Sequence, residues 1–79
     1  MRQKTPKSVI TFATTSDAMA MEAAAREFGI PGRIIPVPSE IDAGCGLAWG
    51  ADAAGHDALI AALDAYAIVH EGLFEVMMY

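Results

Sequence analysis

The chain of 79 residues contains a single cysteine, Cys45. One cysteine excludes an intramolecular disulfide, and it excludes a zinc site built from several thiolates. Basic residues are also few, five against ten acidic ones. The resulting net charge of -5 argues against a nucleic-acid partner, because phosphate contacts need a surplus of lysine and arginine. No uninterrupted apolar run reaches the roughly 20 residues of a membrane span, so we expect no membrane partner.

The residues that are present describe one small folded domain. Hydrophobic residues make up 54% of the chain and charged residues 19%, a balance that excludes an intrinsically disordered protein. The basic start, residues 1–7, predicts a flexible arm, and residues 8–79 predict one domain. No long apolar segment follows this start, which argues against a secretory signal and favours a cytoplasmic, reducing setting. No motif for a cofactor is present.

The first half of the chain predicts a strand, a helix and a second strand. Residues 8–13 are rich in β-branched side chains and indicate a strand. Residues 14–17 supply candidate N-caps for a helix over 18–28. The triplet 29–31, Gly-Ile-Pro, is a helix stop signal. Residues 33–38 predict a strand whose prolines place it at a sheet edge. The apolar face of the helix comprises Ala18, Met21, Ala25 and Phe28.

The second half predicts a loop over 39–46, a short strand over 47–50, a helix over 54–67 and a last strand over 73–78. The apolar face of this second helix comprises Leu59, Ala62, Leu63 and Tyr66. The resulting order, β-α-β-β-α-β, predicts an α+β, ferredoxin-like fold. In that fold a four-stranded antiparallel sheet with strand order 4-1-3-2 carries two helices on one face.

This topology brings distant segments to one edge of the sheet. The end of the first strand, the start of the first helix, the 39–46 loop and the end of the second helix should meet there. We therefore expect Thr15, Ser16, Cys45 and His70 to share an edge, and His56 to lie at the opposite one.

Cys45 lies between Gly44 and Gly46, which give it little side-chain cover. Glycines also permit backbone angles that turn N–H groups toward a common point, and a thiol beside a helix N-terminus is a better nucleophile. Glu40 and Asp42 are near in sequence and oppose a thiolate. The alternative is that Cys45 is a small buried core residue and its glycines make a tight connection.

Several segments resemble one family. The chain is similar, over roughly residues 9–72, to the small domains of the selenium/sulfur carrier-like family. The matching segments are Thr11-Phe12-Ala13-Thr14-Thr15, Ala18 to Glu22, Gly29-Ile30-Pro31, Pro36-Val37-Pro38 and Gly44-Cys45-Gly46-Leu47-Ala48. The resemblance implies a thiol protein that holds sulfur or selenium on Cys45 and a partner such as a sulfurtransferase-like module. The family pattern has an arginine directly after Pro-Val-Pro, where this chain has Ser39.

The chemistry that the resemblance implies is a persulfide or perselenide on Cys45. Candidate anion-binding groups are the backbone N–H groups near Gly44 and Gly46 and the hydroxyls of Thr15 and Ser16. Because the chain has no second cysteine, the carried atom must pass to another molecule.

Other residues leave further hypotheses open. His70 is a candidate base for Cys45, or a helix C-terminal histidine that interacts with the last carbonyls. His56 and His70 with one cysteine have no zinc spacing, so we expect no metal site. A second class of function is a non-catalytic interaction module that binds a partner through the open sheet face, with Cys45 structural; ordinary enzyme catalysis ranks third. Strand residues on that face predict a homo-oligomer. They are drawn from Ile34, Trp49, Phe74 and Val76.

Overall fold

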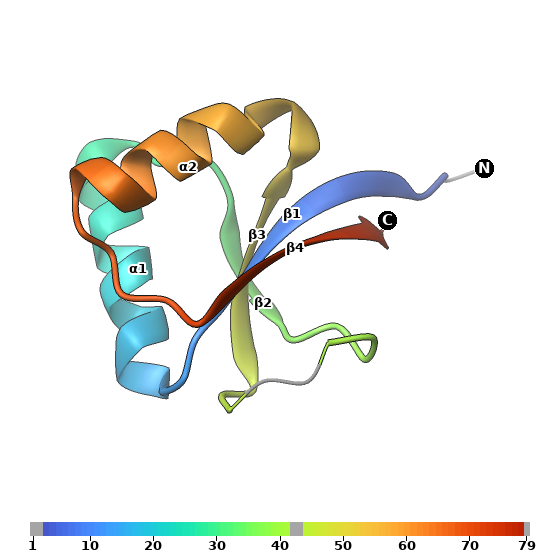
Figure 1. The fold of residues 1–79 in the computed structure, drawn as a ribbon, viewed down its shortest axis with the longest axis horizontal. Coiled ribbons are helices and arrows are strands. Elements are labelled where there is room, and N and C mark those ends of the chain that lie inside the picture. Colours follow the sequence, from blue (N-terminus) through green and yellow to red (C-terminus); the bar gives the residue numbers. More distant parts are fainter. Residues whose placement is uncertain (1–2, 42–43, 79) are drawn as a thin grey trace.

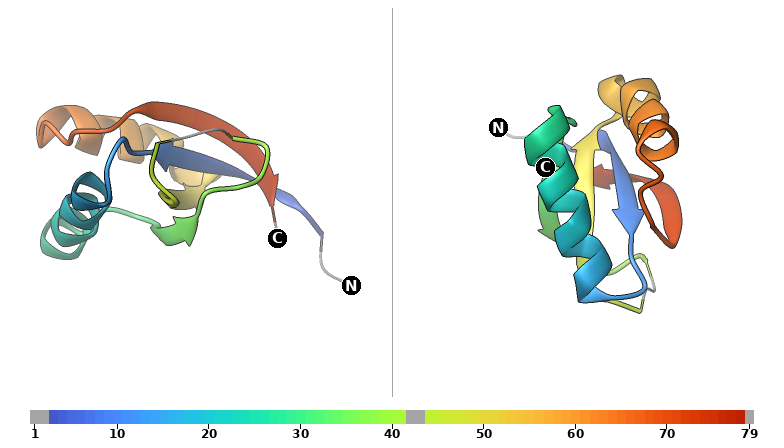
Figure 2. Two further views of the ribbon diagram at one scale, coloured as in Figure 1. Left: turned by 90° about the horizontal axis from the view of Figure 1, so that it is seen from below. Right: turned by 90° about the vertical axis from the view of Figure 1, so that its left-hand side faces the viewer.

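One antiparallel sheet carries both helices on the same face. The computed structural model describes residues 3–41 and 44–78. The elements are β1 (Thr5–Thr11), α1 (Thr15–Phe28), β2 (Arg33–Pro36), β3 (Leu47–Asp52), the 3-10 turn η1 (Ala53–Gly55), α2 (His56–Ala65) and β4 (Gly72–Met78). Figures 1 and 2 show α1 and α2 side by side against this face. The α+β class, the four-stranded antiparallel sheet and the two helices are confirmed.

The strands lie in the order β2-β3-β1-β4, and every neighbouring pair is antiparallel. Read from the β4 edge, this order is 4-1-3-2. β1 is central and pairs with β4 along its whole length, from Thr5 opposite Met78 to Thr11 opposite Gly72. β2 lies at an edge, as its prolines predict, since an edge strand tolerates residues that cannot donate a ladder hydrogen bond.

Local capping fixes both ends of α1. The Thr14 side chain accepts a hydrogen bond of 3.2 Å from the Asp17 N–H, which satisfies one unpaired donor of the first turn. At the other end Gly29 adopts a left-handed conformation with φ 69°, and its N–H and that of Ile30 both donate to the Ala25 carbonyl. The predicted cap segment and stop signal of this helix are therefore confirmed, although α1 begins at Thr15 and not at Ala18.

The larger core fills the space between the sheet and the helices. Trp49 is 3% exposed there, and its indole N–H donates to the Pro31 carbonyl at 2.9 Å. The buried members of this cluster are Ile10, Phe12, Ala18, Met21, Ala25, Ile30, Cys45, Trp49, Ala51, Leu59 and Leu63. Ile34 also packs against them, so Ile34 and Trp49 face the helices and not the open side of the sheet.

A second, smaller cluster lies on the face opposite the helices. Its buried members are Val9, Ala48 and Val76, and its partly buried members are Ile35, Val37, Ile41 and Met78. Val37 and Ile41 belong to the connection between β2 and β3, so this connection folds over part of the face expected to be open. Phe74, two residues before Val76 on β4, shares this side and is 42% exposed. Self-association through this face stays a prediction.

Several element boundaries differ from the predicted ones. β1 begins at Thr5, so residues 5–7 of the expected flexible arm belong to the sheet; Met1 and Arg2 lie outside the described residues. β2 ends early, at Pro36, and β3 continues to Asp52. The early start of β1 and the late end of β3 result from pairing, because Lys7 lies opposite both Asp52 and Val76 and thereby extends the ladder.

The prediction that Phe28 and Tyr66 complete the helix core faces is wrong. Phe28 is 46% exposed and Tyr66 45% exposed. The two rings stack on each other, with centroids 4.0 Å apart and planes 5° apart. Both residues stand at helix C-terminal ends, beyond the sheet that covers Met21 and Leu63, so each ring covers the other in place of the core.

Lys7 and Asp52 form an ion pair across β1 and β3. The Lys7 hydrogen bond, followed by its charge, holds the pKa of the Asp52 carboxyl below its ordinary value of 3.8. Because the pair is largely exposed, its contribution to stability is small.

Asp52→Asn is expected to lower the free energy of unfolding slightly at neutral pH. Since the folded pKa of Asp52 is depressed, the contribution of the pair is fully present above pH 3.8 and is lost as the pH falls through the folded value. The difference in urea midpoint between wild type and variant should therefore shrink in acid. A difference that stays constant with pH would contradict a role for the ionised carboxylate.

Candidate functional site

Cys45 lies at the edge of the sheet where α1 begins. It stands two residues before β3, and Figure 1 shows the start of β3 and the first turn of α1 at the same end of the molecule. The side chain belongs to the core cluster under the helices and is 6% exposed. The expected meeting of the β2–β3 loop with the helix start is thus found in the structure.

Two polar groups contact the sulfur. The Leu47 backbone N–H donates to Sγ at 3.3 Å. The Thr15 hydroxyl lies 3.7 Å from the same atom, a distance at which either group can donate. Thr15 is the first residue of α1, so the sulfur also lies beside the positive end of the helix dipole. Each of these features favours negative charge on a sulfur atom at this position.

The flanking glycines have different surroundings. A Cβ on Gly44 would stand 3.1 Å from the Ala13 carbonyl oxygen, whereas a Cβ on Gly46 would meet nothing within 4 Å. Neither glycine has a positive φ. The glycines therefore matter for the room that they leave beside Cys45 and not for special backbone angles. The β1–α1 connection closes the Gly44 side, and the Gly46 side is open.

The other predicted site residues lie at the same edge without contacting the sulfur. Ser16 is exposed, and no hydrogen bond joins Ser16 or His70 to Cys45 within residues 3–41 and 44–78. The His70 ring binds the Ile68 carbonyl at 2.9 Å through Nδ1. A carbonyl only accepts, so Nδ1 carries the proton and Nε2 is the basic nitrogen. His70 precedes β4 and Cys45 precedes β3, and β1 lies between these two strands. The strand order therefore keeps His70 apart from Cys45.

The loop before Cys45 contains the two acidic residues that are near it in the sequence, Glu40 and Asp42. Glu40 accepts a hydrogen bond of 3.1 Å from the Ser39 hydroxyl, and both residues are exposed. Asp42 lies outside the described residues. Ser39 is thus hydrogen-bonded to its neighbour and carries no positive charge.

The remaining histidine lies at the opposite end of the molecule. His56 opens α2, and its Nδ1 is 3.0 Å from the buried hydroxyl of Ser8. Within the described part of the chain, no three acidic, histidine or cysteine side chains gather as metal ligands, and no helix has the length and apolarity to cross a bilayer.

The Leu47 N–H is one of the backbone groups near Gly46 that we expect to bind an anion, but the sequence does not single it out. Every residue except proline carries such a donor, so residue type gives no signal for it. Only the backbone path through Cys45, Gly46 and Leu47 turns this N–H back toward the sulfur.

A scan against family models matches residues 7–75 to the family described as "Putative Se/S carrier protein-like". The matched segment covers most of the chain, including both groups that contact Sγ. No curated protein matches the chain, and no solved structure matches it.

Proposed function

The chain belongs to the Se/S carrier protein-like family, and from this premise we propose that Cys45 carries one sulfur or selenium atom, as a persulfide or perselenide, for delivery to a partner. The observation that carries this proposal is the polar environment of a lone, nearly buried thiol. A Leu47 N–H and a Thr15 hydroxyl both point to Sγ at the N-terminus of α1.

The transfer step is an exchange at the outer atom of a donor persulfide. The Cys45 thiolate attacks the terminal sulfur of R–S–SH, a new S–S bond forms on Cys45, and the donor leaves as the thiolate R–S⁻. The terminal sulfur keeps its oxidation level, so the step needs no added oxidant. A donor R–S–SeH reacts in the same way and leaves selenium on Cys45. The Gly46 side is the open approach for the donor.

Release requires a second molecule. Within the chain no other cysteine can resolve the adduct, so the acceptor is an external thiolate, and a sulfurtransferase-like module is the proposed partner. A reducing, cytoplasmic compartment keeps the emptied Cys45 available for the next cycle.

We also assign the fold to the ferredoxin-like class. The β-α-β-β-α-β element order and the single helical face support this assignment, as does the strand sequence that reads 4-1-3-2 from one edge. In that class the β1–α1 junction lies beside the start of β3, which is what places Thr15 next to Cys45.

Incubation with glutathione persulfide is expected to raise the intact mass of the folded protein by one sulfur atom. Cys45→Ser should gain no mass, because it removes the only thiol. Glutathione selenopersulfide tests selenium by the same measurement. A wild-type protein that gains no mass while folded, or an adduct that persists in Cys45→Ser, would contradict the carrier proposal and favour a structural Cys45.

Two further variants test whether the Thr15 hydroxyl stabilises the carried atom or whether Cys45 is only accessible to the donor. Thr15→Val keeps the shape of the side chain but removes the hydroxyl, and the adduct should decay about threefold faster for the loss of one weak hydrogen bond. Ser16→Ala is the matched control, because Ser16 is a neighbouring hydroxyl that does not contact Sγ. Equal decay rates in the two variants would remove Thr15 from the site.

A further inference from the structure

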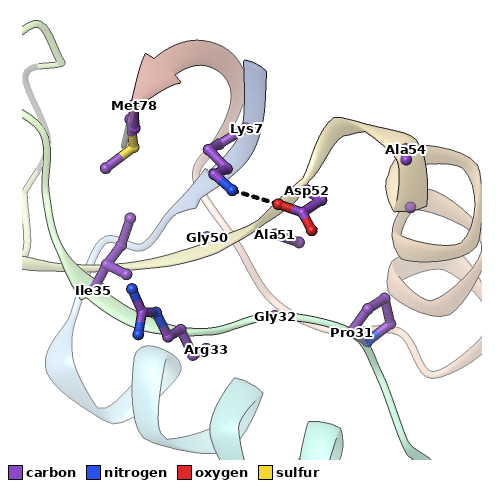
Figure 3. A pocket seen from close by; sticks show the side chains of 11 residues that line it. Lys7, Pro31, Gly32, Arg33, Ile35, Gly50, Ala51, Asp52, Ala54 and Met78 are labelled. Atoms are coloured by element: carbon purple, nitrogen blue, oxygen red, sulfur yellow. Dashed lines mark hydrogen bonds and ion pairs between the residues drawn. The ribbon is translucent and has the colours of Figure 1, made fainter. Parts of the chain in front are cut away.

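A depression of about 610 Å³ lies at the end of the sheet away from Cys45 (Figure 3). It is lined by the first half of β1, β2 and the residues before it, the end of β3, η1 and the last residue of β4. Along β3 the lining residue nearest to Cys45 is Gly50, about 10 Å from Leu47 at roughly 3.4 Å for each extended residue. The depression is thus a different site from that of the proposed carrier function.

The charged groups of the depression leave one positive charge in excess. Lys7 and Arg33 line it from β1 and β2, with the Lys7 ammonium directed toward Asp52, the acidic residue of the lining, and the Arg33 guanidinium directed toward Ile35 (Figure 3). Asp52 pairs with Lys7. Arg33 is exposed and has no ion-pair partner within the described residues. This local excess of positive charge stands out on a chain whose net charge is -5.

The walls of the depression are apolar and part of its floor lacks side chains. Ile35, Met78 and Pro31 form apolar walls around the two basic groups. Gly50 makes room for the Ile35 wall, since a Cβ at that position would meet the Ile35 Cδ1 atom at 2.8 Å. A volume of several hundred Å³, apolar walls and a few convergent polar groups are typical of a small-molecule site.

We infer that this depression binds a small organic anion, with an apolar body between Ile35 and Met78 and an acidic head group on the Arg33 guanidinium. Arginine presents several N–H donors in a planar fork that matches carboxylate, sulfonate and phosphate oxygens. The Asp52 carboxylate neutralises Lys7, so the depression offers a ligand only one net positive charge. Arg33 is therefore the group that anchors the anion.

Anilinonaphthalene sulfonate is a suitable probe, because it joins a sulfonate to an apolar body. It should bind the folded wild-type protein with one-to-one stoichiometry and quench Trp49 emission by energy transfer. Trp49 is the chain's single tryptophan, and its indole is bonded to Pro31 in the wall of the depression. The neutral analogue phenylnaphthylamine should bind much more weakly.

Removing a positive or a negative charge from the depression should change the affinity for the sulfonate probe in opposite directions. Arg33→Gln should weaken binding of the sulfonate probe about tenfold, the usual loss for one charge-assisted hydrogen bond. Asp52→Asn should tighten it a few-fold, because Lys7 is released to act on the anion. Arg26→Gln is the matched control, since Arg26 lies on α1, pairs with Glu22 and does not line the depression. Because this probe also binds loosely packed states, the tighter binding must be accompanied by an unchanged near-ultraviolet circular dichroism spectrum of Asp52→Asn.

Three results would overturn the inference. The first is that Arg33→Gln and Arg26→Gln change the affinity for the sulfonate probe equally. The second is that the neutral analogue binds as tightly as the sulfonate probe. The third is that inorganic phosphate displaces the probe at a comparable concentration. The first would place the probe elsewhere, for example on the exposed Phe28 and Tyr66 rings. The second would remove the acidic head group from recognition, and the third would remove the apolar body.

Discussion

Gly32→Ala is expected to destabilise the domain by about 3 kcal/mol or more, through backbone strain and a steric clash together. Gly32 has φ 115°, a conformation that residues with a side chain rarely adopt. A Cβ there would stand 2.6 Å from the Gly50 carbonyl oxygen and would also collide with the Trp49 indole nitrogen. Gly50 pairs with Arg33, so relief of the clash must disturb the β2–β3 ladder or the bond from Trp49 to Pro31.

Gly29→Ala is the matched control for this prediction. Gly29 also has a positive φ, 69°, but a Cβ there would meet nothing within 4 Å. It should therefore lose about 1 kcal/mol, the backbone cost alone. Urea unfolding followed by Trp49 fluorescence measures both variants against a total stability of about 4 to 12 kcal/mol for a chain of this length. Equal losses would show that the surroundings of Gly32 can yield.

The two glycines also show which features of the fold could be predicted from the sequence. Gly29 follows a helix and precedes Ile30 and Pro31, so its left-handed conformation is a local signal, and the structure confirms it. Gly32 has no such signal. Its backbone is determined by the distant Trp49 and Gly50, which pack against it only when β2 and β3 pair.

Some features of the candidate site could likewise be predicted from the sequence, and others could not. The contact between Thr15 and Cys45 follows from topology, because the strand and helix order brings the β1–α1 junction to the β2–β3 loop. The Leu47 N–H does not follow, since it depends on the path of three loop residues. The basic start of the chain predicts a flexible arm that includes Lys7. Only the register that places it opposite Asp52 makes it part of a pocket.

Phe12→Ala is expected to lower the free energy of unfolding by about 3 to 5 kcal/mol, the range for removing a buried aromatic ring. Phe12 is 0% exposed and heads the largest fully buried side chains. It directly follows β1 and precedes the Thr14 cap, so it anchors the connection that holds Thr15 against the sulfur. Phe12→Leu keeps most of the volume and should lose less than about 1.5 kcal/mol. Urea unfolding in sucrose, which favours the folded state, measures both.

The same two variants distinguish a carrier thiol from a core cysteine. A carrier thiol reacts in the native state, and access in the native state does not depend on global stability. The rate of Cys45 alkylation by iodoacetamide should therefore be similar in folded wild type, Phe12→Leu and Phe12→Ala. We expect the three rates to differ by less than about twofold. A structural Cys45 reacts only when the domain opens. Its rate would then rise with the opening equilibrium, more than about a hundredfold for a loss of 3 kcal/mol. Because Cys45 is 6% exposed yet has the open Gly46 beside it, we expect the nearly constant rate; a rise that tracks the measured loss of stability would contradict delivery from the folded protein.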